Sequence, residues 1–150
     1  MDRRLSQLAA RRHGLFTRDQ AYAFGLNEGK LRHGVARGWW RRVARDVFAM
    51  AGAPVTYRQR VLAACLAAPS PAAATDLSGA ALFGLSVPST DEVHVLIERG
   101  RSARGVPGTV HRTVSLPPSD LATIHGIPVL RPARLLCELA RTLDGRAREE

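Results

Sequence analysis

A chain of 150 residues is long enough for one domain or two small ones, and its 45% hydrophobic content is ordinary for a folded protein. No apolar run approaches the length of a membrane span, and the charged N-terminus lacks the hydrophobic segment of a signal peptide, so we expect a cytoplasmic protein. Cys65 and Cys137 show no metal-ligand spacing and are expected to be reduced thiols.

The formal net charge of +9 belongs to one part of the chain. Residues 1–60 contain 13 Lys and Arg against 4 Asp and Glu, an excess of 9, whereas residues 61–150 contain 9 of each kind. A generally basic protein would spread its charge evenly. The asymmetry instead predicts a nucleic-acid-binding module joined to a neutral domain.

The first expected element is a helix from Asp2 to His13. Leu5, Leu8 and Ala9 lie on one face of it, and Gly14 is the expected stop. The basic residues at its end suit the negative end of the helix dipole, and this structural role is preferred to a phosphate contact.

The next stretch predicts two short helices separated by a tight turn. Thr17 and Gln20 form a capping-box pattern, so the first of these helices should begin at Arg18, and Gly25 is expected to end it. Asn27 is a good N-cap for the second. Helix, glycine-containing turn and helix are the layout of a helix-turn-helix unit.

The second of these helices is oriented by Leu31 and Val35, which stand four residues apart and are expected to face inward. The outward face then contains cations and no acid: it presents Gly29, Lys30, His33 and Arg37, with Arg32 at its flank. Such a face suits the guanine acceptors and phosphates of a DNA major groove. An ordinary solvated helix is the alternative, and the local charge excess favours DNA.

Two runs with strand propensity, 39–43 and 47–50, follow and are joined by a three-residue turn. A basic hairpin directly after a helix-turn-helix is typical of a wing. The arginines expected along the phosphate backbone or in the minor groove are Arg41, Arg42 and Arg45. Of the two tryptophans at the root of the hairpin, Trp39 and Trp40, at least one is expected in the core.

We place a domain boundary at the break 51–54, so that a winged helix-turn-helix spans residues 1–52, a linker residues 53–56 and a small α/β domain residues 57–150.

The pattern of the second domain predicts a helix after Thr56 and another from about Leu77 to Phe83, followed by strands at 93–97 and 109–113. A hairpin of 121–124 and 127–130 comes next. The last expected element is a helix from Pro132 with Leu135, Leu136, Leu139 and Leu143 on one face.

The sequence contains no motif typical of a catalytic site. His94 and His111 could meet across paired strands, but two such histidines are far more often ordinary surface or half-buried residues than a metal site. A carboxylate-plus-lysine nuclease is disfavoured because the second half contains no lysine. We therefore expect no enzyme, no cofactor and no metal.

Residues 16–52, FTRDQAYAFGLNEGKLRHGVARGWWRRVARDVFAMAG, resemble the N-terminal winged-helix domain of AbiEi-type antitoxins from type IV toxin–antitoxin systems. The segments TYRQRVLAACLAA, LSGAALFGL, VHVLIERGR and VHRTVSLPPSDLATIHGIPVLRPARLLCELA resemble the continuation found in actinobacterial members. The resemblance extends over about nine-tenths of the chain. Its most specific parts are the wing and the block from LPPSDL to GIPVLRPARLL.

This resemblance implies a transcriptional autoregulator whose winged helix binds double-stranded operator DNA. The second domain would support neutralisation of a nucleotidyltransferase-like toxin, for which direct contact is not required. Carried over by position, Lys30, Arg32, His33 and Arg37 match the recognition helix, and Arg41 and Arg42 match the wing. The full set of expected DNA contacts is Arg18, Asn27, Lys30, Arg32, His33, Arg37, Arg41, Arg42 and Arg45.

The sequence departs from the family pattern in two places. Asp46 stands where relatives often have Gly in the wing turn, although Asp tolerates a left-handed conformation. Residues 75–78 read Thr-Asp-Leu-Ser where relatives often have Ser-His-Arg-Ser, so the role of that His-Arg pair is not transferred. Many relatives also continue into a nuclease-like domain after the last helix, and no such activity is expected here.

The sequence thus predicts an α+β protein, with a winged helix-turn-helix followed by a small α/β domain, that acts as a DNA-binding antitoxin-like autorepressor. Two other functions stay open. One is a protein-interaction adaptor whose winged helix contacts a protein, which the basic helix face disfavours. The other is a non-catalytic remnant of a nuclease-bearing relative.

Overall fold

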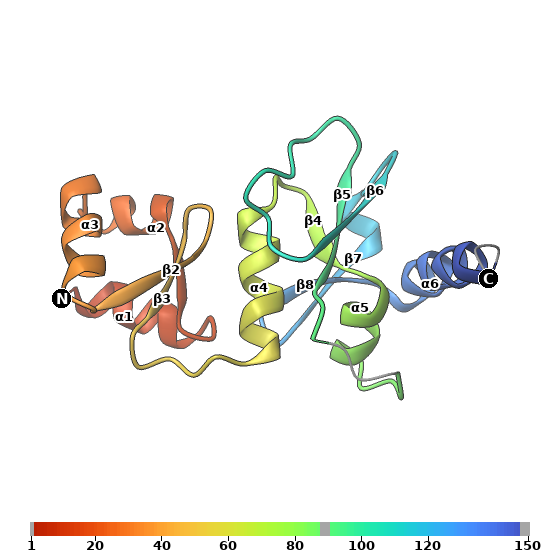
Figure 1. Ribbon diagram of the computed structural model, residues 1–150, viewed down its shortest axis with the longest axis horizontal. Helices are drawn as coiled ribbons and strands as arrows, with labels where there is room; N and C mark the ends of the chain where they lie inside the picture. The colour runs from red at the N-terminus through yellow and green to blue at the C-terminus, as the bar shows by residue number, and fades with distance from the viewer. Residues whose placement is uncertain (1, 88–90, 148–150) are drawn as a thin grey trace.

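The computed structural model describes residues 2–87 and 91–147, with side chains described as far as residue 145. The chain combines helices with two β-sheets, so the fold is of the α+β class, as the sequence predicts. A three-stranded sheet of the first half and a five-stranded sheet of the second half lie on either side of helix α4, Tyr57–Ala67 (Figure 1). Among the described helices, none has both the length and the apolar composition needed to cross a membrane.

The first half has the element order and strand pairing of a winged helix. Its sheet has the strand order β1-β3-β2, and both pairings are antiparallel. The hairpin of β2 and β3 is the wing. The elements are α1 (Arg3–Ala10), β1 (Leu15–Thr17), α2 (Arg18–Ala23), α3 (Glu28–Ala36), β2 (Trp40–Ala44) and β3 (Val47–Met50).

The predicted caps and turns of this half are confirmed. The Thr17 hydroxyl accepts a hydrogen bond from the Gln20 backbone N–H, and the Gln20 side chain accepts one from the Thr17 N–H. The Asn27 side chain caps α3. Gly25 and Asp46 both adopt the left-handed conformation, with φ of 84° and 56°.

Helix α1 is shorter than the sequence predicts. It ends at Ala10 rather than at His13, because His13 and Gly14 take positive φ values of 54° and 82° and turn the chain into β1. Strand β1 itself was not predicted, since three residues give no period-2 pattern to detect.

The first sheet is covered on both faces. One face contributes an aromatic cluster beneath the three helices of this half, in which the Phe16 ring lies 5.6 Å from Trp40 and 5.5 Å from Phe48 between centroids. The other face buries Leu15, Val47 and Ala49 against α4. Because α4 also packs on the second sheet, the two halves share one buried cluster.

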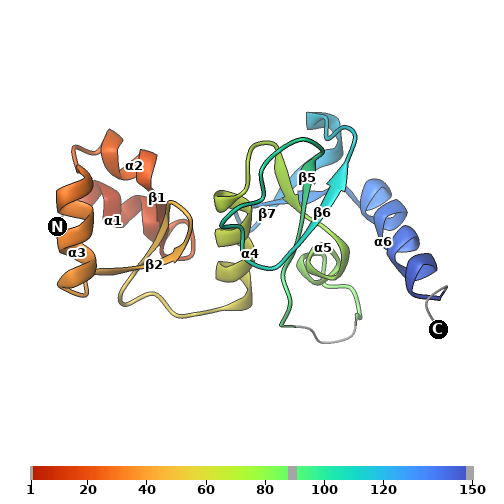
Figure 2. The same cartoon turned by 45° about the horizontal axis from the view of Figure 1, so that its top comes forward.

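The second sheet is mixed and has the strand order β6-β5-β4-β8-β7. The β5–β6 and β4–β8 pairs are parallel, and the β4–β5 and β7–β8 pairs are antiparallel. Helix α4 covers one face, and α5 and α6 lie on the other (Figure 2). The elements after α4 are β4 (Ala72–Ala74), α5 (Asp76–Leu82), β5 (His94–Glu98), β6 (Thr109–Thr113), the 3-10 turn η1 (Pro118–Asp120), β7 (Leu121–Ile124), β8 (Ile127–Leu130) and α6 (Pro132–Ala147).

Most predicted elements of the second half are confirmed, with two exceptions. The central strand β4 was not predicted, because three alanines have no β propensity of their own and are held in the sheet by their neighbours. The predicted apolar face of α6 is wider than the buried one: Leu135 is buried, but Leu136 and Leu143 are 60% and 61% exposed. The helix therefore packs through a narrow strip.

Candidate nucleic-acid interface

Helix α3 lies at the outer end of the first half, away from the second sheet (Figures 1 and 2). Its buried side is formed by Leu31 and Gly34, and a Cβ atom at Gly34 would come within 2.0 Å of the Trp40 ring. The Trp40 indole N–H donates to the Leu31 carbonyl at 3.1 Å. Val35 is 42% exposed, so the prediction that it faces inward is wrong. The missing side chain at Gly34 makes room for Trp40, and this contact sets the orientation of the helix.

The observed orientation brings Arg32 and His33 toward the middle of the outward face, because successive residues are about 100° apart around a helix. All four basic side chains predicted on this helix are exposed: Lys30, Arg32, His33 and Arg37. The Arg32 side chain is 80% exposed and lies 3.9 Å from the Glu28 carboxylate. Arg37 forms no side-chain hydrogen bond or ion pair with any residue that the structure describes.

Two of the expected DNA contacts, Arg18 and Asn27, have structural partners. The Arg18 guanidinium pairs with Glu28 and with Asp46, where Nε lies 2.8 Å from Oδ1. It thereby ties α2 to α3 and to the turn of the wing, and the hydrogen bond to Asp46 raises the pKa of Arg18. The Asn27 side chain accepts the Lys30 N–H at 2.9 Å. Both residues position α3.

An exposed tryptophan lies beside α3. Trp39 is 44% exposed and meets the His33 ring edge-on at 5.5 Å between centroids, whereas Trp40 is 4% exposed. The prediction that at least one of the two lies in the core is confirmed. A hollow of about 470 Å³ is lined by both tryptophans together with Lys30 and His33. The surface around α3 therefore combines cations with an aromatic side chain.

On the wing, Arg41 points toward the second half of the chain. Its guanidinium donates to the Met50 carbonyl at 3.5 Å and to Oε1 of Gln59 at 3.3 Å. Gln59 is 3% exposed and in turn donates to the His13 carbonyl at 2.7 Å. Arg41 is thus part of a hydrogen-bonded chain that links the wing, α4 and the loop before β1.

The tip of the wing touches the loop that joins β5 to β6. The Arg45 N–H donates to the Gly105 carbonyl at 3.4 Å, and its guanidinium donates to the Arg104 carbonyl at 3.5 Å. Arg42 is exposed, and its Nε donates to the Ala44 carbonyl at 3.4 Å. The sequence marks the loop around Arg104 as basic, but nothing in it predicted that this loop adjoins the wing. A hollow of about 380 Å³ is lined by Arg42, Arg45, Arg104 and Gly105.

Residues 3–51 match a protein family described as transcriptional regulator, AbiEi antitoxin. The match covers about a third of the chain and includes every element of the winged helix, from α1 to β3. It confirms the resemblance that the sequence of this segment indicates. No curated protein matches the chain.

Proposed function

We propose that the protein binds double-stranded operator DNA through α3 and represses its own transcription as the antitoxin of a type IV toxin–antitoxin system. Two observations support this. The matched family is one of transcriptional regulators, and the match coincides with the winged helix. The observation that carries the proposal is the exposed side of α3, which presents Lys30, Arg32 and His33, together with Arg37 at the C-cap of the helix.

Within α3, the residues take different parts. The N-terminal part of a recognition helix usually enters the major groove, so Lys30 and His33 contact base edges. Arg37, at the C-terminal end, contacts a phosphate, and Arg32, near the middle of the outward face, contacts a second phosphate. Phosphate contacts position the helix, whereas base contacts discriminate between sequences.

The wing has a smaller part in this proposal. Arg42 and Arg45 remain exposed and can reach a phosphate backbone that runs past the wing. Arg41 holds the wing against α4, and Arg18 and Asn27 hold α3 in place. None of these three is expected to supply affinity directly.

The functional partner is a nucleotidyltransferase-like toxin in the cytoplasm, and neutralisation does not require direct contact between the two proteins. The protein itself needs no catalytic activity for this role. A reading frame for such a toxin beside that of the protein would support the antitoxin assignment. A nuclease fragment in that place would favour the remnant instead.

The proposal is tested by fluorescence anisotropy with the full chain and two labelled duplexes, one from the region upstream of its own reading frame and one of random sequence. We expect tighter binding to the upstream duplex, and repression of a reporter placed behind it. Equal affinity for both duplexes together with an unrepressed reporter would overturn the proposal.

A second candidate, a protein-interaction adaptor, is favoured by one observation: Val35 and Trp39 are large apolar side chains exposed beside the cations of α3. The two functions differ in salt dependence. DNA binding weakens steeply with salt because counterions are released, whereas an apolar protein contact does not. Trp39→Ala should abolish an adaptor contact and leave the salt dependence of DNA binding unchanged.

A further inference from the structure

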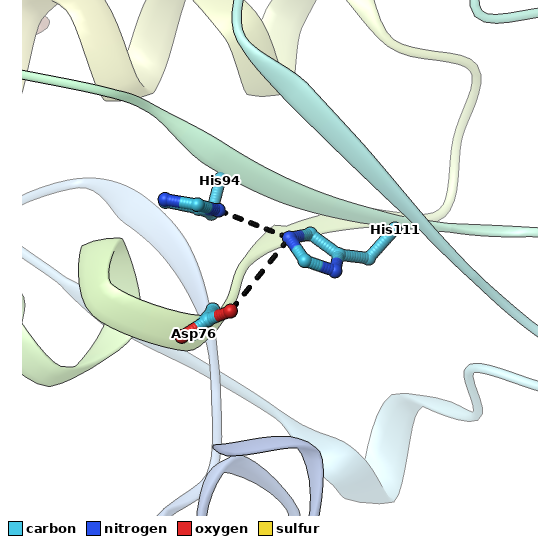
Figure 3. A group of neighbouring side chains, drawn as sticks. All are labelled: Asp76, His94 and His111. Atoms are coloured by element: carbon cyan, nitrogen blue, oxygen red, sulfur yellow. Dashed lines mark hydrogen bonds and ion pairs between the residues drawn. The ribbon is translucent and has the colours of Figure 1, made fainter. Parts of the chain in front are cut away.

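Three side chains from separate segments converge at the end of the second sheet near the start of α5. Asp76 is the first residue of α5, His94 begins β5, and His111 lies in the middle of the neighbouring parallel strand β6 (Figure 3). One ligand atom of each residue lies within 4.8 Å of the ligand atoms of the other two. The sequence raised the meeting of the two histidines but gave no sign of the carboxylate.

The distances place one nitrogen of His111 at the centre of the group. Nε2 of His111 lies 3.0 Å from Nδ1 of His94 and 3.9 Å from Oδ2 of Asp76. Asp76 and His94 are each 2% exposed, and the His111 side chain is 26% exposed. The group is therefore buried on two sides and opens to solvent beside His111.

Hydrogen bonding alone leaves this group incomplete. A single proton between the two rings can satisfy both facing nitrogens, but Oδ2 of Asp76 is buried and has no hydrogen-bond partner in the described part of the chain. A buried carboxylate oxygen without a partner is costly. Asp76 also holds a left-handed backbone with φ of 48°, which is uncommon for a non-glycine residue.

We propose that Asp76, His94 and His111 bind a divalent transition-metal ion, with Zn²⁺ the ion that the ligands fit best. Zn²⁺ bonds to imidazole nitrogen and carboxylate oxygen are about 2.0–2.2 Å long, so tetrahedral ligands are about 3.3–3.5 Å apart. The observed separations of 3.0 and 3.9 Å lie on either side of this spacing. Two imidazoles disfavour Mg²⁺ and Ca²⁺, which select oxygen ligands.

The surroundings suit a metal ligand set. Nε2 of His94, on the far side of its ring, lies 3.8 Å from the Glu92 carboxylate, and Thr109 donates a hydrogen bond to that carboxylate. At 3.8 Å the pair is not a hydrogen bond, and Nε2 of His94 is buried without a hydrogen-bond partner among the described residues; a carboxylate behind a ligating histidine is nevertheless its usual partner at a metal site. Three protein ligands leave a fourth position for water, which can enter beside His111. The ion would join α5 to β5 and β6 at one point.

The test uses the full chain after treatment with a chelator and dialysis, titrated with Zn²⁺ by isothermal calorimetry and with Co²⁺ by visible absorption. We expect one ion per chain, a ligand-field spectrum of a low-coordinate Co²⁺ site, a higher melting temperature with Zn²⁺ and no response to Mg²⁺. His111→Ala and Asp76→Asn should each weaken Zn²⁺ binding at least roughly a hundredfold, the upper end of the losses that follow removal of an outer partner.

His125→Asn is the matched control. It removes an exposed histidine at the β7–β8 turn, where Asn tolerates the left-handed conformation, and should bind Zn²⁺ like the unaltered chain. Far-UV circular dichroism without metal checks that Asp76→Asn still folds. His111→Ala alters the more exposed ligand, so its Zn²⁺ affinity tests the site even if Asp76→Asn fails to fold. The proposal is overturned if the unaltered chain binds no stoichiometric Zn²⁺, or if both ligand variants bind it as tightly as His125→Asn.

Discussion

Helix α3 and the wing carry similar charge in the sequence but present it differently in the folded protein. On α3, Arg32 and Arg37 extend from a surface that no other element of the described chain covers. On the wing, Arg41 donates to Gln59 of the second half, and Arg45 donates to the Arg104 carbonyl although its side chain remains exposed. A charge count along the chain treats these arginines as equal. The exposure of each arginine, and with it its availability for the proposed DNA contact, depends on which element packs behind its strand or helix.

The cause of the difference is the α4 helix. Because α4 covers the face of the first sheet that contains Leu15, Val47 and Ala49, the wing is held between the two halves. Helix α3 packs on the opposite face through Leu31 and Gly34 and keeps its outer side open. The proposed DNA contact therefore shifts from the wing toward α3.

The largest effect is expected from Leu31→Ala, which should lower the free energy of unfolding by about 2–5 kcal/mol because the side chain is 1% exposed. Val35→Ala is the matched control and should stay within about 0.5 kcal/mol, since Val35 is exposed. Urea denaturation of the two variants measures this. Equal losses would show that α3 faces inward through Leu31 and Val35, and the set of outward cations would then be a different one.

Replacement of Lys30 tests whether α3 recognises bases. Lys30→Ala should weaken binding to the cognate operator by about 1–3 kcal/mol if Lys30 contacts a guanine, and should weaken binding to random DNA much less. Its melting temperature should not change, because the side chain is exposed. An unchanged ratio of the two affinities in a competition assay would remove Lys30 from the base-contacting set.

Replacement of Arg41 tests whether this wing residue stabilises the fold rather than contacting DNA. Arg41→Ala should lower the free energy of unfolding by about 1 kcal/mol, because the buried Gln59 carbonyl oxygen loses a donor. Arg42→Ala, at the neighbouring exposed position, should not alter stability measurably. Thermal melts of both variants separate the two roles. A destabilised Arg42→Ala beside a stable Arg41→Ala would reverse the assignment.

The sequence predicted what short-range chemistry determines. Thr17, Gln20 and Asn27 act within three residues of themselves, so the helix starts of the first half were found correctly. The orientation of α3 was not predicted correctly. The helical period alone cannot decide whether Gly34 or Val35 faces the core, because the deciding contact is with Trp40, later in the chain.

Long-range contacts explain the remaining differences. Strands β1 and β4 are each three residues long and owe their conformation to the sheets around them. The contact of the wing with the loop near Arg104 joins residues 59 positions apart. In the same way, the neighbourhood of Asp76 and the two histidines arises from the β5–β6 pairing and the start of α5. The strand pattern allowed the two histidines to meet, but no periodicity or motif encodes the approach of Asp76 to them or of the Arg104 loop to the wing.

The most direct test of the central claim compares the salt dependence of DNA binding among the unaltered chain, Arg37→Ala and Arg41→Ala, with a random duplex at several salt concentrations. Log K falls linearly with log salt, and each lost phosphate contact makes this negative slope shallower by about 0.9. We expect Arg37→Ala to reduce the magnitude of the slope by about this amount and Arg41→Ala to leave it unchanged. A slope that becomes shallower in Arg41→Ala but stays unchanged in Arg37→Ala would contradict the assignment of the phosphate contact to Arg37.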